Sequence, residues 1–207
     1  VWFIEEVVPT PMLMYAVDQE DLAMGAMITA SHNPSEYNGI KIIVEGGKDA
    51  PVQVTDRLEE LIATIPPLKA PQEDFFAALE AGKITHYSNK NAYIDSLLEQ
   101  IDVSAVQKLN LNVLFNPMFG VSKDIMAMCL ASLRCSVDLI NAGRDTMFGQ
   151  RTPSPSRESL QDMEYLMKQG KYHIGIATDG DSDRIGLYDE LGNYIDANEI
   201  IKLLYYY

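Results

Sequence analysis

Three carboxylates lie close together in the segment TDGDSDR, which spans residues 178–184. Asp179, Asp181 and Asp183 occupy alternate positions shortly after the apolar run IGIA. In a tight loop such side chains can converge on one cation, and without a cation they would repel one another. Oxygen ligands favour Mg²⁺, Mn²⁺ or Ca²⁺ over zinc, whose sites usually include Cys or His, and the segment contains neither. The pattern therefore predicts a site for a divalent cation.

Two other interpretations of this segment are open. Asp179, Asp181, Asp183 and Glu190 match positions 1, 3, 5 and 12 of the EF-hand calcium loop. Position 6 of that loop needs glycine for its sharp turn, but here it holds Arg184, and the IGLY that follows favours a strand over a helix. An EF-hand is therefore disfavoured. A solvated acidic turn remains an alternative, because Asp and Gly are common in any loop.

A second polar cluster follows the apolar stretch AMIT in the segment AMITASHNPSEYNGIKI, residues 26–42. A strand at AMITA would deliver Ser31 and His32 to the edge of a sheet. A serine hydroxyl is a poor nucleophile unless a base or a metal assists it. The segment is not the GxSxG elbow of an α/β-hydrolase, because Thr29 and Asn33 stand where that motif needs glycine. Taken alone, it fits a catalytic loop and a structural turn equally well.

In the first part of the chain, strands and helices alternate around this serine. Thr10 can cap a helix with Pro11 at its first position, and AMIT then forms a strand. The dipeptide Asn-Gly marks a turn before a second strand, IKIIV, which contains Lys41. An amphipathic helix is expected over residues 56–65, and a linker between about residues 66 and 90. Three prolines interrupt regular structure in that linker: Pro66, Pro67 and Pro71.

The second part repeats the alternation and ends on the acidic segment. Its expected elements are a helix from about Asn91, a strand at 111–115, the loop NPMFG, a helix at 122–133, a strand at 136–140, the proline-broken RTPSPS, a helix from Ser154 or Ser156, and a strand at 173–178. The fold predicted is α/β, with two α/β units that have mixed, mostly parallel sheets flanked by helices. We place the units at residues 1–88 and 89–207. Such sheets bind ligands beyond the carboxyl ends of their strands.

Composition excludes some functions and leaves others open. Thirty acidic and sixteen basic residues give a net charge of −14, which opposes binding to nucleic acid. No apolar run approaches the roughly 20 residues that cross a bilayer, so no membrane partner is expected. Cys129 and Cys135 form neither a CxxC motif nor a plausible short disulfide, and no secretion signal is present, so we expect reduced thiols in a cytoplasmic protein. Both ends of the chain look cut, which predicts a longer protein.

Taken in order, TASHNP, YNGIK and TDGDSDR resemble the α-D-phosphohexomutases, the phosphoglucomutase and phosphomannomutase group. The likeness runs from about Thr10 to the end of the chain. It implies that residues 1–88 form the C-terminal part of domain 1, with the phosphoserine loop, and that residues 89–207 form domain 2, with the metal loop. It also implies that domains 3 and 4, which choose the sugar, are missing, so the chain alone is expected to have little or no mutase activity.

The resemblance also implies roles for individual residues. Ser31 would be the phosphoserine, and a phosphoryl oxygen on it would complete the ligands of a Mg²⁺ ion. Lys41 would lie near the transferring phosphoryl group, as a fixed charge or a general base. Arg184 would be a cationic residue beside the metal loop, and His32 would help to position the serine. The Mg²⁺ ligands would be Asp179, Asp181 and Asp183. One residue departs from the family pattern: Phe119, in NPMFG, stands where that pattern leads us to expect histidine. We expect the Phe119 side chain to serve only in packing.

The activity implied is intramolecular phosphotransfer, which interconverts hexose 1-phosphate and hexose 6-phosphate through a phosphoserine and a hexose 1,6-bisphosphate. Phosphoglucomutase or phosphomannomutase is the first expectation, and phosphoglucosamine mutase and phosphopentomutase are alternatives. From a different class, the chain could be a non-catalytic module that binds a divalent metal and whose serine carries no phosphate. His86 and His173 are expected to be surface or packing residues.

Overall fold

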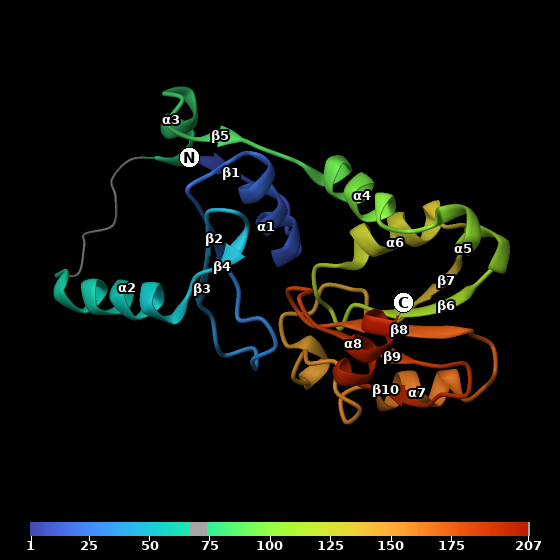
Figure 1. Cartoon of the computed structure of the whole chain (residues 1–207). Helices are drawn as coiled ribbons and strands as arrows, with labels where there is room; N and C mark the ends of the chain where they lie inside the picture. The colour runs from blue at the N-terminus through green and yellow to red at the C-terminus, as the bar shows by residue number, and fades with distance from the viewer. Residues whose placement is uncertain (67–73, 207) are drawn as a thin grey trace.

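The computed structural model describes residues 1–66 and 74–206, and the chain forms two α/β units joined through a helix (Figure 1). In Figure 1 the first unit runs from blue to cyan and the second from yellow-green to red. The joining helix, α4 (Lys90–Glu99), packs against a helix of each unit: α1 (Thr10–Gln19) and α6 (Lys123–Ser132). Val8, Met12, Tyr93, Ile94, Ile125 and Cys129 bury one another at this junction. The expected α/β fold is confirmed.

The first unit presents its polar loop at one end of a small sheet. Strands β2 (Met24–Ile28), β3 (Ile40–Val44) and β4 (Lys48–Asp49) form it in that order, and every pairing is antiparallel. Its strands therefore depart from the mostly parallel arrangement predicted, because the short connection over residues 29–39 returns the chain directly alongside β2. In this register Ile28 faces Ile40, so the end of β2 and the start of β3 lie at the same edge. The loop between them carries Ser31.

The second unit is built on a sheet of five strands in the order β10-β9-β8-β6-β7. Strands β7 (Ser136–Leu139), β6 (Asn112–Asn116) and β8 (Ile174–Thr178) are parallel, whereas β9 (Ile185–Tyr188) and β10 (Tyr194–Ile195) run antiparallel. Helices lie on both sides of this sheet in Figure 1. Residues 113–115 of β6 are buried, with Leu114 packed against α7 (Gln161–Met167) and its two neighbours packed against α6. The carboxyl ends of β6 and β8 are neighbours, so the loops NPMFG and TDGDSDR begin side by side.

Some elements differ from expectation. The helix after RTPSPS begins at Gln161, because residues 152–160 form successive tight turns in which Ser154 and Ser156 donate their N–H groups to carbonyls two residues earlier. The expected linker contains α3 (Phe75–Glu80) and β5 (Thr85–His86), which pairs with β1 (Trp2–Phe3). Helix α5 (Val103–Leu109) was not predicted. Pro67 and Pro71 lie outside the described residues. The unit boundaries at 88 and 89 stay a prediction.

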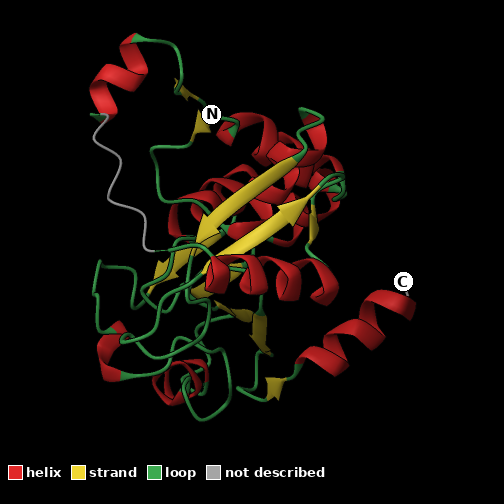
Figure 2. Cartoon of the chain, turned by 90° about the vertical axis from the view of Figure 1, so that its left-hand side faces the viewer, coloured by secondary structure: helices red, strands yellow, loops and turns green. Residues whose placement is uncertain are grey.

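Two helices stand at the periphery of the molecule (Figures 1 and 2). The amphipathic helix expected near residues 56–65 is present as α2 (Val52–Thr64), and none of its residues is buried. Helix α8 (Ala197–Tyr206) buries Ile200 and exposes its other large apolar side chains. Among the residues described, no helix combines the length and apolar character required to cross a bilayer.

Candidate active site

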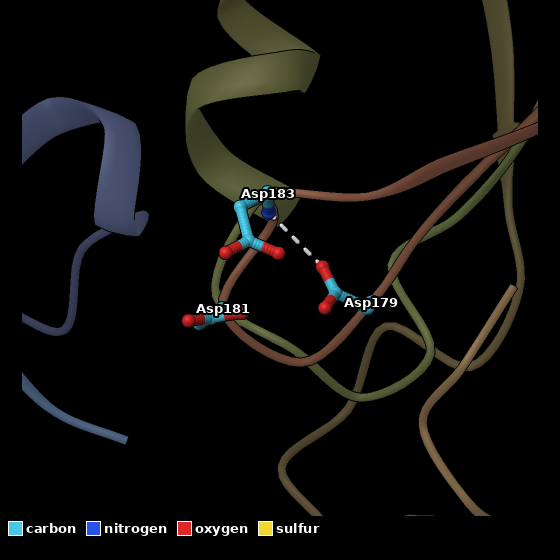
Figure 3. Close-up of side chains that lie close together, drawn as sticks. All are labelled: Asp179, Asp181 and Asp183. Atoms are coloured by element: carbon cyan, nitrogen blue, oxygen red, sulfur yellow. Dashed lines mark hydrogen bonds between the residues drawn. The ribbon is translucent and has the colours of Figure 1, made fainter. Parts of the chain in front are cut away.

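The acidic segment forms a compact loop in which the three predicted carboxylates converge (Figure 3). One oxygen from each of Asp179, Asp181 and Asp183 lies within 4.8 Å of the other two. Asp179 shapes the loop, because its Oδ1 accepts the N–H groups of Asp183 at 3.0 Å and Arg184 at 3.1 Å. Asp179 and Asp181 are buried and Asp183 is exposed, so the cluster opens to solvent on one side.

The donors of this loop fit a divalent cation. All three are carboxylates, and Oδ1 of Asp181 is buried without a hydrogen-bond partner in the described structure. Burial raises the pKa of Asp179 to about 6, and the negative charges of Asp183 and Asp181 act in the same direction, although the Arg184 N–H opposes them. A bound cation would give the unpaired oxygen of Asp181 a partner and would reduce the repulsion among the three carboxylates. Mg²⁺, Mn²⁺ and Ca²⁺ all accept such ligands.

The EF-hand interpretation fails in the structure. The loop leads into the strand β9 rather than into a helix. Glu190 lies beyond that strand, in the turn before β10, and the converging carboxylates of the described residues do not include it. A calcium loop of that type needs the residue at its last position to return to the cation.

Ser31 lies against this cluster although 148 residues separate it from Asp179. Its Oγ donates to Asp179 Oδ2 at 3.1 Å and lies 3.2 Å from Nδ1 of His32. The Ser31 backbone adopts a left-handed φ of 52°, which is uncommon for a residue with a side chain, and its N–H donates to Thr29 Oγ1 at 2.8 Å. The loop therefore holds the hydroxyl in one place, next to a buried carboxylate and an imidazole.

Lys41 reaches the same cluster from β3. Its Nζ lies 2.5 Å from Asp183 Oδ2 and 3.3 Å from Asp181 Oδ2. Burial alone would lower the pKa of Lys41, but the ion pairs with Asp183 and Asp181 outweigh it, and the pKa is raised. Lys41 is therefore a positive charge at neutral pH in this structure. This favours the first of the two roles considered for it, a fixed charge, over a general base.

The remaining predicted residue, Arg184, contributes differently. Its backbone N–H and carbonyl help to close the acidic loop around Asp179. Its side chain is exposed and pairs with no described residue. The guanidinium of Arg184 thus stays apart from the cluster. The structure brings together the other six predicted side chains: Ser31, His32, Lys41, Asp179, Asp181 and Asp183.

Two contributors to the site were missed. Thr10 was expected to cap α1, but Pro9 occupies the cap position and the Thr10 hydroxyl instead donates to Asp181 Oδ2 at 2.8 Å. Gly180 was treated only as part of the motif, yet a Cβ there would lie 2.7 Å from the carbonyl oxygen of Ser31. Neither contact leaves a local signal, because each partner lies in the other unit of the chain.

The other singled-out side chains take structural positions. The ring of Phe119 lies against Gly149, where a Cβ would be 2.8 Å from the ring edge, so packing accounts for it. His86 lies 3.6 Å from Glu5, and His173 accepts the N–H of Asn112. Cys129 is buried, and both cysteines are free thiols, with pKa values that burial raises.

Two known domain families match this chain. The family models for the phosphoglucomutase/phosphomannomutase α/β/α domains I and II match residues 1–68 and 91–192. Together the two matches cover most of the chain. The chain belongs to the α-D-phosphohexomutase family, the phosphoglucomutase/phosphomannomutase group.

Individual relatives carry different names within that group. The chain is 32% identical to a phosphoglucomutase/phosphomannomutase of Thermococcus kodakarensis, over 96% of this chain and 42% of the relative. It is 31% identical to a phosphoglucosamine/phosphogalactosamine mutase of Sulfurisphaera tokodaii, over 89% of this chain and 40% of the relative. The chain thus spans about two fifths of the length of these curated relatives.

Solved structures show the same fold. A putative phosphomannomutase from Thermus thermophilus superposes with a TM-score of 0.86 at 24% identity, over 100% of this chain and 46% of that one. The phosphoglucomutase parafusin from Paramecium superposes with a TM-score of 0.73 at 20% identity, over 91% of this chain and 40% of that one. At these identities the superpositions establish the arrangement of the two units and nothing about the substrate.

The raised pKa of Asp179 predicts a pH dependence of stability in the absence of metal. An unfolded aspartate titrates near about 3.9, so the folded chain binds this proton more tightly than the unfolded chain. This contribution to stability is present in full below about pH 4 and is lost as the pH rises through about 6, and we expect it to amount to about 1–3 kcal/mol. Thermal melts in a chelator between pH 4 and pH 8 measure it.

The control for this prediction is Asp179→Asn, which cannot ionise. Relative to that of the variant, the wild-type melting temperature should fall as the pH rises from about 4 to about 6. Parallel curves for the two proteins would show that Asp179 does not titrate as its burial suggests.

Proposed function

We propose that this chain provides the phosphoryl carrier and the metal loop of a phosphohexomutase, with Ser31 as the residue that carries the phosphoryl group. The observation that carries the proposal is the contact between Ser31 Oγ and Asp179 Oδ2 at 3.1 Å, which places a hydroxyl from one unit at a carboxylate cluster of the other. Asp179, Asp181 and Asp183 are proposed to hold a Mg²⁺ ion.

The proposed reaction is an exchange with no net loss of phosphate. A hydroxyl oxygen of hexose 1-phosphate attacks the phosphorus of phospho-Ser31, the bond from phosphorus to Ser31 Oγ breaks, and the hydroxyl proton passes by way of a base to the released Ser31 Oγ. The product is hexose 1,6-bisphosphate. After the bisphosphate has turned over in the site, Ser31 Oγ attacks the phosphorus at C1 and the bond from that phosphorus to the sugar oxygen breaks. The serine proton passes by way of a base to that sugar oxygen, and hexose 6-phosphate is released. Serine is therefore phosphorylated again at the end of the cycle.

The residues of this chain can support each demand of that exchange. A bound Mg²⁺ would neutralise the developing charge on the phosphoryl oxygens. Lys41 holds a second positive charge at the same place, next to Asp181 and Asp183. His32 Nδ1, at 3.2 Å from Ser31 Oγ, is within reach to accept the proton of the serine hydroxyl when that oxygen attacks. Phosphoryl transfer depends mostly on such positioning and charge stabilisation.

The identity of the sugar is the finer part of the proposal. We expect glucose or mannose phosphates first, which agrees with the name of the Thermococcus relative, and amino-sugar phosphates as the alternative, which agrees with that of the Sulfurisphaera relative. The sequence identities to the two relatives differ by one percentage point, so sequence similarity does not decide between the two classes of sugar. Mutase assays of the full-length protein with glucose, mannose and glucosamine phosphates, compared at equal concentration, rank the sugars, because the domains expected to choose the sugar lie outside this chain.

The proposal is tested by intact-mass measurement. Incubation of the dephosphorylated chain with Mg²⁺ and glucose 1,6-bisphosphate should add the mass of one phosphoryl group, and peptide mapping should place it on Ser31. A full-length protein that binds Mg²⁺ but is not phosphorylated by glucose, mannose or glucosamine 1,6-bisphosphate would contradict a mutase and support the non-catalytic metal-binding module.

Substitution of Gly180 by alanine should slow this phosphorylation. The added Cβ would lie 2.7 Å from the carbonyl oxygen of Ser31. That oxygen belongs to the backbone and cannot rotate away as a flexible side chain could, so the two loops must move apart. A displacement of about 1 Å between reacting groups can lower a rate on the order of 100-fold. The measurement is the rate of phosphoryl gain by the chain.

Gly143→Ala is the matched control, because no atom lies within 4 Å of the position of its added Cβ. It should react at the wild-type rate. Equal rates for Gly180→Ala and wild type would show that the contact between the two loops does not matter for the transfer.

A further inference from the structure

Asp181 is held by donors that come from the other unit of the molecule. The Thr10 hydroxyl donates to Asp181 Oδ2 at 2.8 Å, and the Thr10 N–H donates to the Asp181 carbonyl oxygen at 2.9 Å. Lys41 Nζ lies 3.3 Å from the same Oδ2. Thr10 is fully buried, and 171 residues separate it from Asp181. One residue of the first unit thus fixes both the backbone and the carboxylate of a residue in the acidic loop, the first through its own N–H group and the second through its hydroxyl.

The consequence lies in the other carboxylate oxygen. Two donors occupy Oδ2, whereas Oδ1 is buried and has no hydrogen-bond partner in the described structure. A carboxylate that is free to rotate could exchange its two oxygens. With Oδ2 and the backbone carbonyl both bonded to Thr10, the direction of Oδ1 is set. It remains available as a ligand within the cluster of Asp179 and Asp183.

The helix that begins at Thr10 does not require this hydroxyl. Pro9 occupies the cap position of α1, and no side chain caps the helix there. The bond to Asp181 is the only one that the Thr10 hydroxyl makes within the described part of the chain. Thr10 also begins the helix that packs on β2 and β3, the strands that flank the Ser31 loop and carry Lys41. Its contact therefore ties the geometry of the cation ligands to the unit that carries the serine.

We propose that Thr10 is a positioning residue for the cation site: its hydroxyl orients Asp181 so that the free oxygen faces the cation. This inference rests on the proposed function of the acidic loop as a Mg²⁺ site. Partners that orient a metal ligand through a hydrogen bond commonly change metal affinity 10–100-fold when they are removed. Thr10 would act through Asp181 and would not touch the cation.

The test is a Mg²⁺ titration by calorimetry on the 207-residue chain and its variants. Thr10→Val keeps the shape and the backbone N–H but loses the hydroxyl, and it should weaken Mg²⁺ binding roughly 10-fold or more. Thr10→Ser keeps the hydroxyl and should bind within about twofold of wild type. Val17→Ala, in the same helix and fully buried, should lower the melting temperature in chelator and leave the Mg²⁺ affinity unchanged.

The outcomes separate the two proposals. No Mg²⁺ binding by the wild type would overturn the proposed cation site and this inference with it. Binding by the wild type together with unchanged affinity in Thr10→Val, or equal weakening in Val17→Ala, would overturn the role of Thr10 alone. Should Thr10→Val not fold, Thr10→Cys has a weak donor of similar size, and an affinity equal to that of wild type would count against the inference.

Discussion

Replacement of Ser31 by alanine is expected to abolish phosphorylation of the chain by glucose 1,6-bisphosphate. The variant loses the only oxygen that the proposal allows to carry the phosphoryl group, the Oγ that lies 3.1 Å from Asp179. Removal of a nucleophile of this kind commonly lowers a rate by a factor of about 10⁶, so no transfer should be measurable by intact mass. Mg²⁺ binding should remain, because the three aspartates are untouched.

Ser35→Ala is the matched control for this variant. Ser35 lies in the same loop and is half-buried, and within the described part of the chain its hydroxyl hydrogen-bonds only to the sulfur of Met147, at 3.7 Å. It should be phosphorylated at the wild-type rate. A phosphoryl group that still appears on the Ser31→Ala protein would place the carrier at another residue and would refute the assignment.

Asp181→Asn should cause the largest loss of Mg²⁺ affinity among single substitutions in the acidic loop. Asparagine can keep the hydrogen bond from Thr10 when its amide oxygen takes the place of Oδ2, so the loop retains its shape. The uncharged NH2 group, which cannot bind a cation, then takes the place of the buried Oδ1. The loss of one of three carboxylates from a hard-cation site is expected to weaken binding at least about 100-fold. Calorimetry and the rise in melting temperature with Mg²⁺ both measure it, and phosphorylation of Ser31 should fall in parallel.

A control for charge alone is Asp95→Asn, which removes a carboxylate that is exposed on α4. It should bind Mg²⁺ as the wild type does. If Asp181→Asn retained the affinity of wild type, the cation would not be held by the acidic loop, and the metal site would have to be sought elsewhere.

The clustering of the carboxylates in the candidate site could be predicted because they lie in one short motif. TDGDSDR contains all three carboxylates within a few residues, and the apolar run before it identified the strand that presents them. The strands on both sides of Ser31 were predicted close to their observed limits, β2 and β3, for the same reason. In each case the periodicity of a few neighbouring side chains was sufficient.

What could not be predicted depends on contacts between distant parts of the chain. Threonine is a common helix-capping residue, so the sequence suggested that role for Thr10. Only the folded structure shows that the Thr10 hydroxyl donates to Asp181. The close approach of Gly180 to Ser31 is likewise a property of two loops in different units. The late start of α7 has another cause, since the serines that could have capped it donate to local carbonyls in a run of turns.

The division of the site between two units has a consequence for folding. The contacts that bring Thr10, Ser31 and Lys41 to the acidic loop join residues 171, 148 and 140 positions apart. Pairings between such distant residues form slowly, because a long stretch of chain must first be closed. We therefore expect the acidic loop and the serine loop to meet late, after each unit has formed its own sheet. Until that step, a newly synthesised chain would present Ser31 without its cation, and phosphorylation would report that the last stage of folding is complete.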